Sequence, residues 1–131
     1  IGRSKKPRLD VPGLLTILET CKELGAEIAV LEEVGGLPRQ SATHAFTFGW
    51  TTGCTYAALV ASRIAVERVR PAVWKKMRRC GKTDDEIVRR AQEMFPDDMH
   101  RWTGPKGGVK DGRCEAAMLA FFAATHAHGR T

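Results

Sequence analysis

One short segment limits the possible folds of this chain more than any other. The run from Glu27 to Val34, EIAVLEEV, is largely apolar, lies between glycines and ends in two carboxylates followed by a valine. A short apolar run of this kind is typical of a parallel strand that is buried on both faces. Because helices normally cover both faces of such a sheet, the segment predicts an α/β fold.

Helical patterns surround this strand. Asp10 stands before an apolar series at helical spacing from Leu14 to Leu24, which predicts a capped first helix. The later sequence predicts a second helix from about Ala42 to Arg63, a second strand from Ala65 to Val69, a brief helix from Pro71, a helix from Asp84 to about Phe95 behind the capping box Thr83-Asp84-Asp85-Glu86, a loop from Asp97 to Lys110, and a last helix from near Asp111.

These elements predict one domain over residues 1–131, with few parallel strands packed against four or five helices. At 131 residues, 43% of them apolar, the chain is long enough to bury a core. No apolar run approaches the roughly 20 residues that span a bilayer, and no secretory signal is evident, so we expect an intracellular protein. The four cysteines lack paired spacing and are expected to be reduced thiols.

The net charge of +6 predicts attraction to a polyanion, and nucleic acid is the first candidate. The basic residues form three groups along the sequence: Arg3, Lys5, Lys6 and Arg8; then Arg68, Arg70, Lys75, Lys76, Arg78, Arg79 and Lys82; then Lys106, Lys110 and Arg113. Charge alone leaves a second interpretation open, in which these side chains simply form a solvated surface.

Carboxylates occur where an α/β fold could gather them. Glu32 and Glu33 end the first predicted strand, and sites form beyond the carboxyl ends of such strands. Asp111 and Glu115 are one helical turn apart at the start of the last helix. Converging carboxylates repel each other unless cations neutralise them, and oxygen ligands suit Mg²⁺ or Mn²⁺. The alternative is that Asp111 only caps its helix and Glu115 pairs with a surface cation.

Several blocks together resemble a known family. VLEEVGGLPRQ, FTFGWTTG, RPAVWKK, GKTDDEIVRRAQEMFP and KDGRCEAAMLA occur in the order found in the phage and plant-organelle branch of the RuvC-like Holliday-junction resolvases, within the ribonuclease H-like superfamily. The resemblance runs from about Ile28 to Ala120. It implies a ribonuclease H-like fold in which Glu32 is the strand-end catalytic glutamate and Asp111 and Glu115 are the acidic pair of the last helix, all three binding Mg²⁺ or Mn²⁺. Glu33 falls where many relatives have glutamine and is not assigned.

The resemblance also concerns basic residues. Lys75 and Lys110 match basic positions that the family places near the scissile phosphate, where a lysine acts as a point charge on phosphate oxygens. Lys82 is expected to contact DNA as well. Arg113 is expected either to touch DNA or to brace the acidic pair.

The resemblance implies a metal-dependent endonuclease that resolves branched DNA as a homodimer. The family opens with a strand carrying G-x-D-P-G-x-x-G, whose aspartate is a further metal ligand, and nothing before Asp10 matches it. We therefore expect a partial, N-terminally incomplete fold with an exposed sheet edge at Glu27 to Val34, which could pair with a second copy. Two alternatives follow: a non-catalytic DNA-binding or structural remnant that oligomerises through this edge, and a partner-binding module that uses the same edge.

Overall fold

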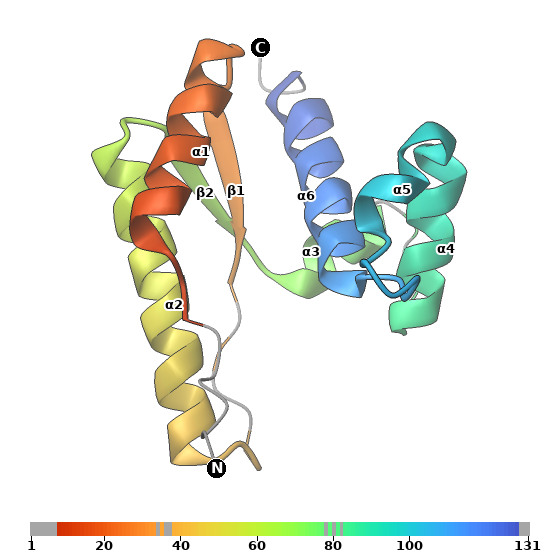
Figure 1. Cartoon of the computed structure of the whole chain (residues 1–131), viewed down its shortest axis with the longest axis horizontal. Coiled ribbons are helices and arrows are strands. Elements are labelled where there is room, and N and C mark those ends of the chain that lie inside the picture. Colours follow the sequence, from red (N-terminus) through yellow and green to blue (C-terminus); the bar gives the residue numbers. More distant parts are fainter. Residues whose placement is uncertain are drawn as a thin grey trace. The chain divides into compact units, whose positions relative to one another are not determined.

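A computed structural model describes residues 8–33, 35, 38–77, 79, 81 and 83–128. This part of the chain forms a mixed α/β structure with six α-helices, a 3₁₀ helix and two strands (Figure 1). In chain order the elements are α1 (Val11–Glu23), β1 (Ile28–Glu32), α2 (Ala42–Ala61), β2 (Ala65–Val69), α3 (Pro71–Met77), α4 (Asp84–Met94), η1 (Pro96–Asp98), α5 (Met99–Trp102) and α6 (Asp111–His128). The predicted α/β class is confirmed.

The two strands pair in parallel. The Ala65 N–H donates to the Glu27 carbonyl at 3.3 Å, and the Glu33 N–H donates to the Val69 carbonyl at 2.8 Å. The partners therefore advance in the same direction on both strands, as in a parallel ladder. Both predicted strands are present, although β1 is shorter than the predicted run, whose last residue, Val34, lies outside the described residues.

Local capping signals set the helix starts. The Asp10 side chain accepts a hydrogen bond from the Gly13 N–H at 3.0 Å, which fixes the start of α1. Thr83 and Glu86 form the predicted reciprocal box at the start of α4, with distances of 3.0 and 3.3 Å. Each cap satisfies backbone N–H groups that have no partner inside the helix.

The predicted loop from Asp97 to Lys110 is wrong in its first part. This stretch contains η1 and α5, followed by an isolated antiparallel bridge between Thr103 and Val109. Trp102 is buried, and its ring lies 5.9 Å from that of Phe95 in an edge-on arrangement. Burial of this aromatic pair orders a segment whose glycines and prolines indicate turns, and it adds a sixth helix to the four or five predicted.

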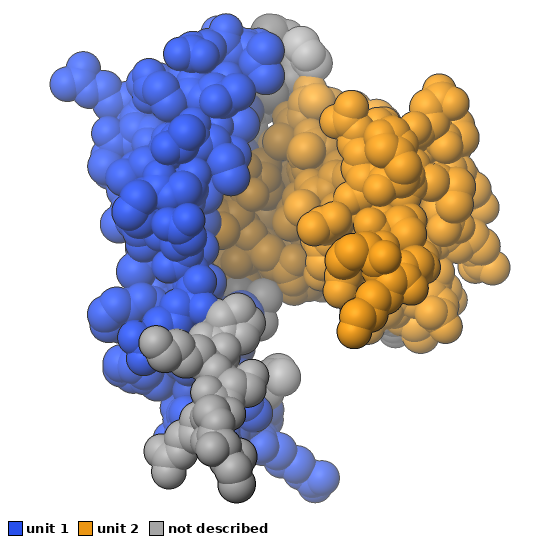
Figure 2. Space-filling view, viewed as in Figure 1, with its two compact units in different colours: residues 1–29, 35–67 blue, residues 30–34, 68–131 orange. Residues whose placement is uncertain are grey.

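The described chain divides into two compact units (Figure 2). Each unit has its own apolar cluster. Unit 1 comprises Ile1–Ala29 and Gly35–Glu67, and unit 2 comprises Val30–Val34 and Arg68–Thr131. In unit 1, α1 packs on α2, and the buried residues are Leu18, Ala58, Leu59 and Ile64. Whether the whole chain acts as one domain stays a prediction.

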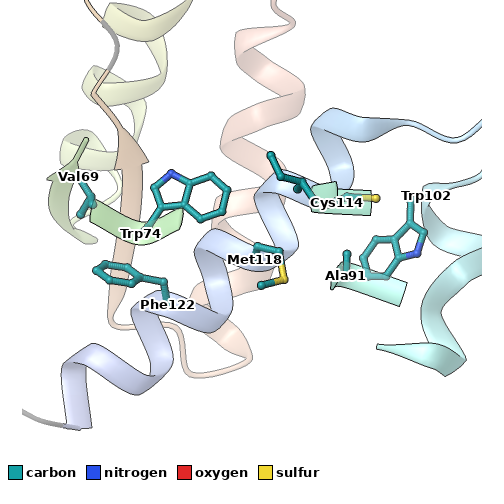
Figure 3. Packing of buried hydrophobic residues seen from close by; sticks show 8 residues of the cluster. Val69, Trp74, Ala91, Trp102, Cys114, Met118 and Phe122 are labelled. Carbon is teal, nitrogen blue, oxygen red and sulfur yellow. The ribbon is translucent and has the colours of Figure 1, made fainter. Parts of the chain in front are cut away.

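Unit 2 holds the larger core. Its buried side chains come from β2, α3, α4, α5 and α6, and they are Val69, Trp74, Ile87, Ala91, Trp102, Cys114, Met118 and Phe122 (Figure 3). Helix α6 packs against α3, α4 and α5. The core therefore fixes the first turns of α6 against α3, which positions the side chains at the start of α6 and on α3.

The remaining expectations concern thiols and membranes. Cys114 is a buried free thiol, Cys21 and Cys54 are half-buried free thiols, and Cys80 lies outside the described residues. None of the helices in the described ranges combines the length and the apolar character that crossing a bilayer requires.

Candidate acidic site

The predicted carboxylates all belong to unit 2. Glu32 is the last residue of β1, Asp111 is the first residue of α6, and Glu115 follows one turn later. Lys75 projects from α3 into the same neighbourhood, where its Nζ lies 3.9 Å from Glu115 Oε1. Residues separated by more than 80 positions in sequence are thus brought together within one compact unit.

Glu115 is the centre of this arrangement. Its side chain keeps 30% of its exposure, and that of Lys75 keeps 24%. Burial raises the pKa of the Glu115 carboxyl above its ordinary value, and the negative charge of Glu32 raises it further. The Lys75 ammonium opposes this shift, while Asp84 and Asp111 add to it. The charges of Glu32 and Asp111 therefore both act on the Glu115 carboxyl.

Asp84 is a member of this acidic group that the sequence did not identify. It is the first residue of α4, and the capping box already accounts for an acidic residue there. No spacing in the sequence links it to Glu115, since the two lie on different helices. Its contribution to the pKa of Glu115 shows that it shares the electrostatic environment of the site.

Trp74 anchors the helix that carries Lys75. Its side chain is fully buried in the unit 2 core. The Lys75 ammonium lies 5.4 Å from the centroid of the Trp74 ring, within the range of a cation–π interaction. The indole Nε1 is buried and finds no hydrogen-bond partner among the described atoms. Burial of the indole restricts α3 and with it the position of the Lys75 ammonium.

The basic residues predicted around Asp111 have different environments. Lys110 is exposed, and its backbone N–H donates to the Trp102 carbonyl at 2.6 Å. Its side chain passes over Gly104, where an added Cβ would stand 2.8 Å from the Lys110 Cε. Arg113 donates from Nη1 to the Arg101 carbonyl at 3.0 Å, so it links α6 to α5. Lys82 lies outside the described residues.

Glu33 is not among the charges that shift the pKa of Glu115. Its Oε1 lies 3.9 Å from Arg68 Nη2, and both side chains are largely exposed. An adjacent carboxylate with a cationic partner of its own makes Glu33 a natural comparison for Glu32.

The donor chemistry suits a hard cation, but the side chains do not form a closed ligand group. Carboxylate oxygens are the ligands that Mg²⁺ and Mn²⁺ prefer, and mutual repulsion favours a cation among them. In the described ranges, no three His, Cys, Asp or Glu side chains lie close enough together to hold a metal ion. The site therefore has the required residue types in one neighbourhood, with wider spacing than a metal-bound state needs.

Comparisons with known proteins bear on the fold. No protein-family model matches the chain, and no curated protein matches it in sequence. Among solved structures, the chain is similar to T. thermophilus RuvC in complex with a Holliday junction substrate, with a TM-score of 0.66 and 17% sequence identity. The match covers 99% of this chain and 76% of that one. The chain therefore has a RuvC-like architecture, a partial ribonuclease H-like fold, as predicted.

Proposed function

We propose that this chain is a metal-dependent endonuclease that cuts branched DNA, of the RuvC type and of its phage and plant-organelle branch. The observation that carries the proposal is the group of carboxylates around Glu115, with the Lys75 ammonium beside it, on a RuvC-like architecture. A structural neighbour with that architecture was solved in complex with a Holliday junction substrate, which supports branched DNA as the ligand.

In this proposal Glu32, Asp111 and Glu115 supply oxygen ligands to Mg²⁺ or Mn²⁺. The ion would polarise the scissile phosphate and stabilise the charge that develops on it. Burial and neighbouring carboxylates raise the pKa of Glu115, and a cation bound among these carboxylates would favour its charged form. Asp84 adds negative charge on the α4 side of the same group.

Lysines would hold the substrate. The Lys75 ammonium pairs with the Glu115 carboxylate in the free protein. A phosphate oxygen that enters the site could replace this carboxylate as the partner of the ammonium. Lys110 stands beside Asp111 with an exposed side chain. Lys82 is proposed to contact the backbone as well. Arg113 braces α5 against α6 through its hydrogen bond to the Arg101 carbonyl, and its remaining N–H groups are proposed to contact DNA.

A second copy of the chain would complete the enzyme, and α2 offers a face for it. An apolar stripe of exposed residues runs along this helix at alternating spacings of four and three, and it consists of Phe46, Trp50, Gly53, Ala57 and Val60. This spacing is that of a seam between paired helices. Phe46 and Trp50 are 70% and 62% exposed, and their rings lie 6.1 Å apart. The small residues at the middle of the stripe would let two helices approach closely.

The dimer is tested with a charge placed on the stripe. Trp50→Glu should convert a dimer seen by light scattering into a monomer, because it would bury a carboxylate in an apolar seam. Thr51→Glu, on another side of the same helix, should leave the dimer intact. If both variants stay dimeric, or both become monomeric, the stripe on α2 is not shown to be the interface. The open edge of β1, where Glu27 to Val34 could pair with the same segment of a second copy, is then the candidate interface.

The catalytic proposal is tested with adjacent glutamates. Glu32→Gln should abolish Mg²⁺-dependent cleavage of a four-way junction while leaving junction binding intact, whereas Glu33→Gln should retain cleavage. Both substitutions remove one negative charge at the end of the same strand, so general electrostatics cannot separate them. Loss of cleavage in both, or in neither, contradicts the assignment of Glu32.

The spacing of the acids favours a second candidate function. Since no described group of side chains is closed around a metal position, the chain could bind branched DNA without cutting it. That protein would prefer junctions over linear duplex, with affinity falling steeply as salt rises. It would show no cleavage with Mg²⁺ or Mn²⁺ under conditions where binding is saturated.

A further inference from the structure

A charged cavity lies in unit 2, and none of the residues that line it belongs to the acidic group. It has a volume of about 420 Å³ and is lined by Arg79, Gly81, Glu86, Arg89, Arg90 and Glu93. Three guanidinium groups therefore face one space, together with two carboxylates. Arginines in a concave site are suited to phosphate, because the planar guanidinium donates two parallel hydrogen bonds.

Both carboxylates of the cavity have partners within the protein. Glu86 accepts from the Thr83 N–H at 3.0 Å in the capping box of α4. Glu93 accepts from Arg90 at 3.2 Å. Gly81 leaves room for the Glu86 side chain, since a Cβ at this position would collide with it. Toward the described residues, neither Arg79 nor Arg89 makes an ion pair.

The backbone of Arg79 is also unusual. Its φ of 53° lies in the left-handed region, which favours glycine, and its N–H donates to the Lys76 carbonyl at 3.3 Å just beyond α3. A side chain in this conformation destabilises the fold relative to glycine. Arg63 has the same geometry beyond α2, with a φ of 58° and an N–H that donates to the Val60 carbonyl at 3.0 Å. Only the first of these arginines lines the cavity.

We propose that Arg79 and Arg89 hold one backbone phosphate of DNA in this cavity, as an anchor outside the acidic site. The inference rests on the proposed function in taking DNA as the ligand, although it does not require that the DNA be cut. Holding one phosphate at a distance from the cleavage centre would orient an arm of the substrate without reading its sequence.

The matched arginines provide the test. Arg79→Gly and Arg63→Gly each remove one positive charge and relieve a left-handed backbone, so both should raise the Tm by several degrees. The dissociation constant of a labelled four-way junction is then measured from about 50 to about 200 mM salt. Arg79→Gly should lower the slope of log K against log salt by about 0.9, which corresponds to one phosphate contact. Arg63→Gly should leave the slope unchanged.

Further variants distinguish a shared site from general charge. Arg89→Gln should lower the slope as Arg79→Gly does, and the double variant should lower it by no more than either alone, because one phosphate is lost. Equal slopes for Arg79→Gly and Arg63→Gly overturn the proposal. The proposal is also overturned if inorganic phosphate raises the Tm of the wild type but not of Arg79→Gly, while both proteins have the same DNA slope. The ligand of the cavity is then free phosphate.

The same measurements separate this inference from the nuclease proposal. If the wild type binds junctions through Arg79 but never cuts them, the anchor stands and the nuclease proposal fails. If the wild type cuts junctions and the slope of Arg79→Gly matches that of Arg63→Gly, only the anchor fails.

Discussion

The ion pair between Lys75 and Glu115 can be measured directly through protein stability. At the observed 3.9 Å, two unit charges attract by about 1 kcal/mol in water and by about 4 kcal/mol at an effective dielectric constant of about 20. Both side chains keep a quarter to a third of their exposure, and solvent screening favours the lower part of this range. We expect a coupling of about 1–2 kcal/mol at pH 7.

A double-mutant cycle isolates that coupling. Lys75→Gln should destabilise the fold, because it leaves Glu115 facing other carboxylates and removes the contact with the Trp74 ring. In a Glu115→Gln background the same substitution should cost less by the coupling energy, since the ring contact is lost in both backgrounds and cancels. The free energies of unfolding come from urea titrations of the four proteins.

Two conditions make this prediction refutable. Lys76→Gln, a neighbouring lysine on the same helix with an exposed side chain, should show no coupling to Glu115→Gln. At about pH 3, where glutamate is protonated, the Lys75 coupling should vanish. A coupling below about 0.3 kcal/mol at pH 7, or one that persists at about pH 3, would refute a stabilising ion pair between Lys75 and Glu115.

Three further outcomes follow from the same unit. Burial and neighbouring carboxylates raise the pKa of Glu115, so the folded state holds this proton more tightly than the unfolded state does. The free energy of unfolding of the wild type should therefore fall as the pH rises from the ordinary glutamate pKa through the raised one. In urea titrations across this pH range, Glu115→Gln should remove that fall. Phe122→Ala should cost about 3–5 kcal/mol by urea unfolding, whereas the exposed Val73→Ala should stay within about 0.5 kcal/mol. Mn²⁺ should raise the Tm of the wild type and of Glu33→Gln in a thermal melt, and an equal rise in Glu32→Gln would remove Glu32 from the cation site.

Much of the fold could be predicted because local signals determine it. The capping box before α4 is complete within four residues, and β2 has the bounds that its sequence predicts. Helix α5 was missed for the opposite reason. It depends on the burial of Trp102 against Phe95, a contact that no short window of sequence reveals, and glycine and proline nearby indicated a loop.

The site was predictable to a similar degree. The position of Glu32 at a strand end and the one-turn spacing of Asp111 and Glu115 identified three carboxylates that the fold brings into one unit. Asp84 was missed because a helix cap already explains an acidic residue in the first turn. The two expected roles of Arg113, contact with DNA and bracing of the acidic pair, stay predictions, and the hydrogen bond from its guanidinium to the Arg101 carbonyl was not foreseen. Pairing of this kind depends on how α5 folds back, which the sequence did not reveal.

Positive and negative groups in this chain act over different distances, and this difference connects the proposed attraction of DNA with the proposed need for a metal ion. The net charge of +6 attracts a polyanion across tens of ångströms at low salt. Around Glu115, however, burial and the negative charges of Glu32, Asp84 and Asp111 raise the pKa of its carboxyl, and the Lys75 ammonium at 3.9 Å offsets only part of this shift. A phosphate drawn in by the surface would therefore be repelled at the site itself. A divalent cation held by the same carboxylates would reverse the sign of that local field, so that the residues which oppose the substrate in the free protein would favour it once the ion is bound.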